Sequence, residues 1–128
     1  MKFLFDTHIL LWAVEGSAKL PADVYKILAD PAAELIFSVA SIWEIAIKHA
    51  KGLPSFQARP EIVRSSLLTH GYSELVIQGG HAVAAGSLPR IHKDPFDRVL
   101  VAQAMIEGIT LLTADLVIAQ YPGPIRKV

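Results

Sequence analysis

Short apolar runs alternate along the chain with longer segments in which apolar residues recur every three or four positions. The runs are nearly continuous, which is typical of parallel strands buried on both faces. They predict strands at Lys2–Phe5, Glu34–Ser38, Glu74–Ile77, Ile109–Thr113 and Ile125–Val128. The helical spacing between them predicts helices at Thr7–Val14, Pro21–Ala29, Ser41–Lys51, Pro60–His70, His81–Leu88, Pro95–Glu107 and Leu116–Gln120. Strand and helix therefore follow one another almost throughout.

This alternation predicts the fold class. Pro21, Pro60 and Pro95 stand where helices should begin, and Gly52 and Gly108 stand where helices should end. Parallel strands need crossover connections, and right-handed crossovers cover both faces of a sheet with helices. We therefore predict an α/β fold, a three-layer α/β/α sandwich around a central, mostly parallel sheet of four to five strands.

Length and hydrophobicity limit the organisation of the chain. Its 128 residues suit a single domain, residues 1–128. The hydrophobic fraction of 52% is high for a soluble monomer, so we expect part of the surface to be covered in a homodimer. Asp6 and His8 interrupt the apolar start, and no apolar run is long enough to span a membrane. We therefore expect a soluble, cytoplasmic protein.

Cysteine content and charge exclude several kinds of site. The chain has no cysteine, so it has no disulfide, no thiolate nucleophile and no zinc–thiolate site. Any metal must be held by oxygen or imidazole. The 12 Lys and Arg residues balance the 12 Asp and Glu residues, so the strongly basic field of many nucleic-acid-binding proteins is missing. A nucleic-acid function would need a local basic patch or a metal ion.

Acidic residues follow the ends of the predicted strands. Asp6 comes directly after the first strand, and Asp115 comes two residues after the strand that ends at Thr113. Glu44 and Asp97 come near the starts of two predicted helices. In open parallel sheets, ligands bind beyond the carboxyl ends of the strands. We therefore expect these carboxylates to gather at one edge of the sheet.

Helix capping explains each of these acids taken singly. Asp6, Asp94 and Asp115 suit N-caps, and Ser41 with Glu44 forms a capping-box pattern. Capping alone does not explain the full charges, because Ser, Thr and Asn cap helices as well. Carboxylates that converge repel one another, and a divalent cation relieves that repulsion. The cluster therefore predicts a hard ion, Mg²⁺ or Mn²⁺, which can activate water and neutralise charge on a phosphodiester.

Four blocks of sequence resemble the PIN-domain nucleases, and the similarity is greatest to the bacterial toxins of the VapC type. The blocks are Phe3–His8, Ser38–Ile45, Asp94–Ala104 and Leu112–Asp115, and they occur in the order of the family. The resemblance implies a PIN-like fold and Mg²⁺-dependent cleavage of RNA. It also implies homodimers and neutralisation by a small antitoxin protein.

The resemblance also implies a set of site residues. The metal-binding and catalytic acids would be Asp6, Glu44, Asp97 and Asp115. Thr113 and Thr7 would orient these acids through their hydroxyl groups. Two residues compete for the third acidic position. Asp97 has the spacing of the family, whereas Asp94 precedes Pro95 as an N-cap would and is a candidate for a supporting function.

Several other side chains could serve the same site. The candidates for binding RNA phosphates are Arg90, His92, Lys93 and Arg98. A solvated helix start explains these four equally well. Lys48 lies one turn after Glu44 and could pair with it or face the site. Trp12 and Trp43 lie in apolar helical patterns, which favours packing in the core or in a dimer interface over base stacking.

Two other kinds of function, phosphotransfer and non-catalytic binding, would use an acidic edge of this kind. A phosphatase with an aspartate nucleophile needs a second Asp two residues after Asp6, where this chain has His8, and a receiver domain needs an early acidic pair and a late lysine. A non-catalytic module would use the acidic edge to hold a nucleotide or a protein. The chain has no Gly-rich loop after the first strand, which argues against a dinucleotide site.

Overall fold

The computed structural model describes residues 1–128, and five strands form its central sheet. The strands are β1 (Lys2–Phe5), β2 (Glu34–Ser38), β3 (Ser73–Leu75), β4 (Thr110–Thr113) and β5 (Ile125–Lys127). Their order is β3-β2-β1-β4-β5, and every neighbouring pair is parallel. The predicted α/β class is confirmed, and the sheet is parallel throughout.

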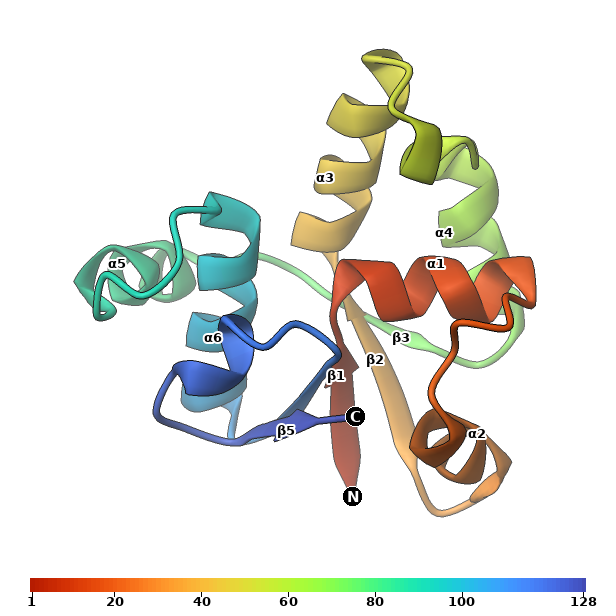
Figure 1. The fold of residues 1–128 in the computed structure, drawn as a ribbon. Helices are drawn as coiled ribbons and strands as arrows, with labels where there is room; N and C mark the ends of the chain where they lie inside the picture. The colour runs from red at the N-terminus through yellow and green to blue at the C-terminus, as the bar shows by residue number, and fades with distance from the viewer.

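Helices cover both faces of this sheet. They are α1 (Thr7–Glu15), α2 (Ala22–Ala29), α3 (Val39–Ala50), α4 (Pro60–Thr69), α5 (Gly79–Ser87) and α6 (Pro95–Glu107), with short 3₁₀ helices η1 (Pro54–Phe56) and η2 (Ile118–Gln120). Figure 1 shows α1, α2 and α4 on one side of the sheet and α5 and α6 on the other, with α3 rising from the end of β2. The predicted three-layer sandwich is therefore confirmed.

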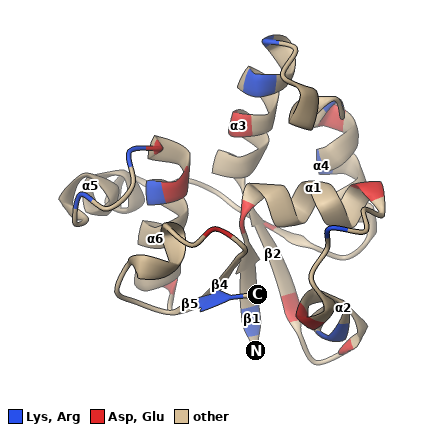
Figure 2. Ribbon diagram, viewed as in Figure 1, with Lys and Arg blue, Asp and Glu red and all other residues tan.

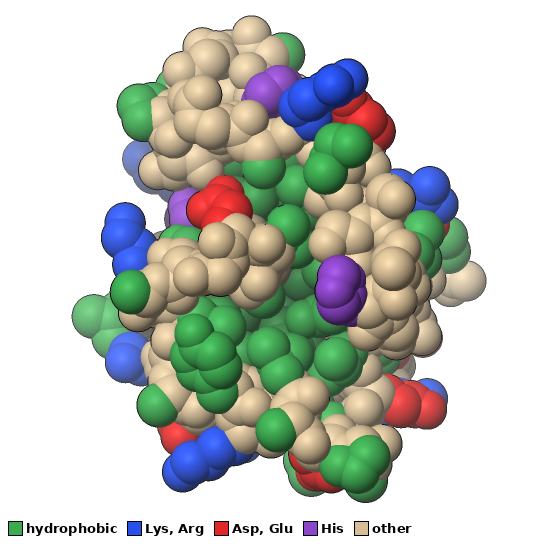
Figure 3. Space-filling view, turned by 90° about the vertical axis from the view of Figure 1, so that its right-hand side faces the viewer, with side chains coloured by type: hydrophobic (Ala, Val, Ile, Leu, Met, Phe, Trp, Pro, Cys, Tyr) green, Lys and Arg blue, Asp and Glu red, His purple; other side chains and the backbone are tan.

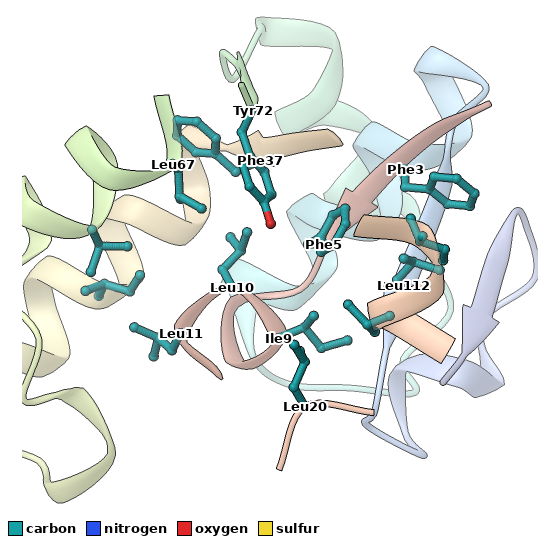
Figure 4. Packing of buried hydrophobic residues seen from close by; sticks show 14 of the residues in the cluster. Phe3, Phe5, Ile9, Leu10, Leu11, Leu20, Phe37, Leu67, Tyr72 and Leu112 are labelled. Carbon is teal, nitrogen blue, oxygen red and sulfur yellow. The ribbon is translucent and has the colours of Figure 1, made fainter. Parts of the chain in front are cut away.

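The strands have two buried faces, which explains their continuous apolar sequences. Phe3 and Phe5 on β1 pack into the cluster formed with α1, α2 and α4 (Figure 4), whereas Leu4 between them packs into a second cluster with α5 and α6. Full burial of such side chains contributes about 1.5–3 kcal/mol each to folding. The core on both faces holds the carboxyl end of β1 in a fixed position.

Three of the predicted helices begin at least two residues away from their starts in the structure, whereas the others agree to within one residue. Helix α3 begins at Val39, because the Ser38 hydroxyl accepts the Ala40 N–H and caps it. The capping-box interpretation of Ser41 and Glu44 is therefore wrong, and Glu44 lies in the second turn. The predicted helix Leu116–Gln120 is only the 3₁₀ helix η2, and α5 begins two residues earlier than predicted.

No helix of the structure is both long enough and apolar enough to cross a membrane.

Trp43 does not belong to the core, since 57% of its surface is exposed, and its ring packs edge-to-face against Phe96 at a centroid distance of 5.2 Å. Trp12 is partly buried against the core, as expected. The homodimer stays a prediction.

Candidate active site

The site lies where the order of the strands reverses, at the carboxyl ends of β1 and β4. The backbone N–H of Asp6 donates to the Leu112 carbonyl at 3.0 Å, so the chain after β1 stays beside β4. The Thr113 hydroxyl donates to Asp6 Oδ2 at 2.5 Å and accepts the Asp115 N–H at 3.0 Å. Thr113 therefore connects two acids that are far apart in the sequence.

Asp6 is a buried carboxylate that also caps a helix. Its Oδ1 accepts the Ile9 N–H at 3.0 Å, which confirms the N-cap of α1, and only 4% of the residue is exposed. Burial raises the pKa of Asp6, although the hydrogen bonds from Thr113 and Ile9 act in the opposite direction. The surroundings of the Asp6 side chain therefore disfavour its ionised form.

Glu44 points from α3 toward the start of α1. The Thr7 hydroxyl donates to Glu44 Oε1 at 2.6 Å, and Lys48 Nζ lies 2.5 Å from Glu44 Oε2. The Ser41 hydroxyl lies 3.0 Å from the Thr7 hydroxyl and completes this buried group. Sequence reasoning missed Ser41 as a site residue, because the capping-box pattern offered a sufficient local explanation for it.

The start of α6 contributes two acids with different environments. Asp94 is the N-cap, and its Oδ1 accepts the N–H groups of Phe96 at 2.8 Å and Asp97 at 3.4 Å. Its Oδ2 lies 3.9 Å from Lys48 Nζ. Asp97 lies in the first turn, with 14% of its side chain exposed. The structure thus brings both acids to the site, and only Asp97 has both oxygens free of the capping bonds.

The surroundings of Asp97 disfavour the ionised form of its carboxyl group. Burial is the largest cause, and together with the charge of Asp94 it raises the pKa of Asp97 to about 8. The charges of three further acids act in the same direction, those of Glu44, Asp6 and Asp115. Carboxylates from four separate segments of the chain therefore act on one carboxyl group.

His92 lies among these acids. Its Nε2 is 3.1 Å from Asp97 Oδ2 and 3.7 Å from Asp115 Oδ2. One ligand atom from each of these three residues lies within 4.8 Å of the others. The His92 Nδ1 accepts the Asp94 N–H at 3.1 Å, so the ring proton is on Nε2 and faces Asp97. In this arrangement the Nε2–H of His92 is the imidazole group that lies nearest to Asp97 and Asp115.

Arg98 fastens the loop that carries His92. Its guanidinium donates to the carbonyls of Ala85 at 2.7 Å and Leu88 at 3.1 Å and to the Tyr121 hydroxyl at 3.2 Å. The Tyr121 hydroxyl in turn accepts the His92 N–H at 2.7 Å. Because its donors are engaged inside the protein, Arg98 holds the loop and does not offer them to a phosphate. No pattern in the sequence indicates that Tyr121 binds His92 and Arg98 in this way.

The remaining basic candidates differ from Arg98. Arg90 and Lys93 are exposed in the loop before α6. They remain free to meet a ligand that approaches the acids.

The acids share one pocket of about 180 Å³. Its lining residues are Asp6, Thr7, His8, Glu44, Lys48, His92, Asp94, Asp97, Asp115 and Ile118. Figure 2 shows acidic segments at the starts of α1 and α6, on α3 and in the loop after β4, gathered beyond the end of the sheet. Carboxylate oxygens are the ligands that Mg²⁺ and Mn²⁺ prefer. The donor set in this pocket therefore fits such an ion.

The sequence matches the family model of the PIN domain over residues 3–124. The chain belongs to the PIN domain family. The resemblance given by the four sequence blocks is thereby confirmed. A comparison with curated proteins found no match.

Solved structures with the same fold as this PIN-domain chain include two of VapBC and one of a toxin–antitoxin complex. VapBC2 from Rickettsia felis, bound to a DNA fragment from its promoter, has a TM-score of 0.72 at 14% identity, covering 99% of this chain and 98% of the other. DNA-bound VapBC from Salmonella typhimurium has a TM-score of 0.68 at 17% identity, with 99% and 98% covered. A toxin–antitoxin complex from Klebsiella pneumoniae has a TM-score of 0.64 at 19% identity, with 96% and 94% covered.

A second hollow of the PIN-domain chain lies away from the acids. It has a volume of about 270 Å³ and is lined by Ala13, Val14, Leu28, Leu35, Ser66, Leu67, His70 and Tyr72. These residues come from α1, α2, β2, α4 and the turn before β3. Figure 3 shows hydrophobic side chains across the floor of this face, with a histidine beside them. We refer to this hollow as the apolar groove.

Proposed function

We propose that this PIN-domain protein is a Mg²⁺-dependent endoribonuclease and the toxin of a toxin–antitoxin pair. The observation that carries the proposal is the convergence of Asp6, Glu44, Asp97 and Asp115 around one pocket. Burial, the largest cause, and the charges of the neighbouring acids together raise the pKa of Asp97 to about 8. Capping would not require carboxylates from four segments to face one another. The similarity to chains from toxin–antitoxin complexes supports the biological setting.

Each acid has a defined place in this proposal. Asp6, Glu44, Asp97 and Asp115 would hold the ion, Mg²⁺ or Mn²⁺. A bound divalent ion would supply Lewis-acid stabilisation of the charge that develops on a phosphodiester. The Thr113 hydroxyl fixes Asp6, and the Thr7 hydroxyl fixes Glu44. Asp94 supports the site by capping α6 and thereby setting the position of Asp97.

The exposed loop before α6 is the proposed contact for RNA. Arg90 and Lys93 lie beside His92, so phosphates bound there would lie next to the acidic pocket. The family resemblance favours RNA as the substrate. The net charge of the protein is zero, so no long-range positive field attracts RNA. Binding of RNA would therefore depend on these local positive charges and on the bound ion.

We expect purified protein to cleave total RNA with Mg²⁺ and to lose that activity in EDTA. Asp97→Ala should lower the rate by at least about 100-fold, because the ion loses a ligand that faces the other three acids. Asp94→Ala should keep more activity and lose about 1 kcal/mol of stability with the cap. Gel analysis of RNA and thermal unfolding measure both effects.

Three outcomes of this assay would contradict the proposal. Cleavage that persists in EDTA would remove the metal from the mechanism. Full activity in Asp97→Ala would remove this acid from the site. Binding of Mg²⁺ without any cleavage of RNA would favour the non-catalytic alternative.

We also propose that the apolar groove receives an apolar segment of the antitoxin. Its lining offers aliphatic and aromatic surface on a face opposite to α5 and α6, so a bound segment would not compete with the core. The similar structure from Klebsiella pneumoniae is a toxin–antitoxin complex, which supports such an occupant.

Ala13→Arg should weaken binding of the antitoxin encoded beside this chain by at least about tenfold, since it puts a charged side chain into the apolar groove. RNA cleavage without antitoxin should stay unchanged. Ala82→Arg on α5, on the opposite face of the sheet, is the matched control. Calorimetric titration measures the affinity, and equal affinities of the two variants would contradict this assignment of the groove.

A further inference from the structure

Lys48 brings a fixed positive charge into the acidic pocket. It is the one Lys or Arg among the residues that line the pocket. Its Nζ lies 2.5 Å from Glu44 Oε2 and 3.9 Å from Asp94 Oδ2, and 25% of the side chain is exposed. The ammonium also lies 5.1 Å from the centre of the Phe56 ring. Three side chains from different segments therefore hold the ammonium in place.

Lys48 leaves Glu44 without a free oxygen. The Thr7 hydroxyl donates to Oε1, and the Lys48 ammonium donates to Oε2. Only 3% of the Glu44 side chain is exposed, so the carboxylate has little room to turn toward another partner. A divalent cation that binds Oε2 would lie next to the ammonium, and the repulsion between the two cations favours displacement of Lys48.

The ammonium is charged when it occupies this place. Burial lowers the pKa of Lys48, but the hydrogen bond and the charge of Glu44 outweigh that effect and leave the pKa raised. Asp94 and Asp97 act in the same direction. At neutral pH the pocket therefore contains an internal cation.

We propose that Lys48 is an internal counter-ion that competes with the divalent cation for Glu44. In the metal-free protein it neutralises part of the charge of the acids, and it yields Glu44 when the ion binds. This inference rests on the proposed metal-dependent function. It makes Lys48 a positioning residue that sets the affinity of the site for the ion.

Competition predicts opposite effects on stability and on ion binding. Lys48→Met removes the charge and keeps the apolar stem against Phe56. Without the ammonium, the metal-free acids repel one another more strongly, so the melting temperature in EDTA should fall. The same loss of a nearby positive charge should make Mn²⁺ bind about tenfold more tightly. Lys51→Met is the matched control, because Lys51 ends the same helix and is exposed outside the pocket.

The test is a calorimetric titration of wild type, Lys48→Met and Lys51→Met with Mn²⁺, together with thermal unfolding in EDTA and in saturating Mn²⁺. We expect a lower Kd and a larger Mn²⁺-induced rise in Tm for Lys48→Met alone. Equal Kd values for the two variants, or weaker binding by Lys48→Met, would overturn the inference and leave the proposed function intact. Failure of every variant to bind Mn²⁺ would overturn the metal-dependent function as well.

A second measurement uses the wild-type chain and does not depend on the folding of a variant. Acetylation of lysines by an N-hydroxysuccinimide ester, followed by mass spectrometry, reports how accessible each ammonium group is. We expect Mg²⁺ to raise the modification rate of Lys48 and to leave that of Lys51 unchanged. A Lys48 rate that does not respond to Mg²⁺ in protein that binds the ion would overturn the competition.

Discussion

We expect Asp6→Asn to abolish Mg²⁺-dependent RNA cleavage and to leave the metal-free protein at least as stable as the wild type. Asparagine caps helices as well as aspartate does, so the bond from the Ile9 N–H to Oδ1 survives the change. The change removes the charge and the oxygen that accepts the Thr113 hydroxyl, so one side-chain hydrogen bond is lost as well. Because burial raises the pKa of Asp6, removing the charge also removes a cost to folding.

The expected loss of activity is about 10³-fold, which corresponds to about 4 kcal/mol of transition-state stabilisation. RNA cleavage under single-turnover conditions and urea unfolding in EDTA measure the two effects. Asp23→Asn, the same change at an exposed position on α2, should alter neither. Asp6→Ala removes the cap as well and should lose about 1 kcal/mol of stability relative to Asp6→Asn.

A different outcome would leave Asp6 with a purely structural function. If Asp6→Asn lowered the stability while RNA cleavage continued at the wild-type rate, the carboxylate would serve as a helix cap alone. The acidic cluster would then have to be explained without Asp6.

The layers of the fold could be predicted from sequence because strands buried on both faces are continuously apolar. Phe3, Leu4 and Phe5 pack alternately into the two clusters, so every position of β1 between them must be apolar. A continuous apolar run of this kind can be recognised in the sequence. The start of α3 could not be predicted in the same way. Ser38 and Ser41 both suit an N-cap, and the choice of Ser38 depends on where β2 leaves the sheet.

The part of the site that is formed by residues at the ends of strands could be predicted from the sequence. Asp6 and Asp115 lie beyond neighbouring parallel strands, so their proximity follows from the sheet. The partners of Arg98 could not be foreseen, because a basic residue near a site has the same sequence signal whether it meets solvent or backbone carbonyls. The bond between Tyr121 and His92 joins residues 29 positions apart and depends on the tertiary structure alone.

The metal-free protein should lose stability as the pH rises from about 4 to about 8, owing to Asp97. The pKa of Asp97 is raised from 3.8 to about 8 by burial, the largest cause, and by the neighbouring acids. Below pH 3.8 both the folded and the unfolded chain keep this proton, so the group does not oppose folding. Between the two values the unfolded chain releases the proton and the folded chain keeps it. The free energy of unfolding therefore falls by up to about 1.4 kcal/mol per pH unit.

Comparison with Asp97→Asn isolates this contribution, since asparagine has no proton to release. The variant should be close to the wild type in stability at pH 4 and increasingly more stable than it toward pH 8, as measured by urea unfolding in EDTA. Asp23→Asn should show no such divergence, because Asp23 is exposed on α2. Saturating Mg²⁺ should flatten the wild-type dependence, because a bound cation favours the ionised carboxylate in the folded state. A difference between Asp97→Asn and wild type that stays constant from pH 4 to pH 8 would show that neither burial nor the other acids raise the pKa of Asp97.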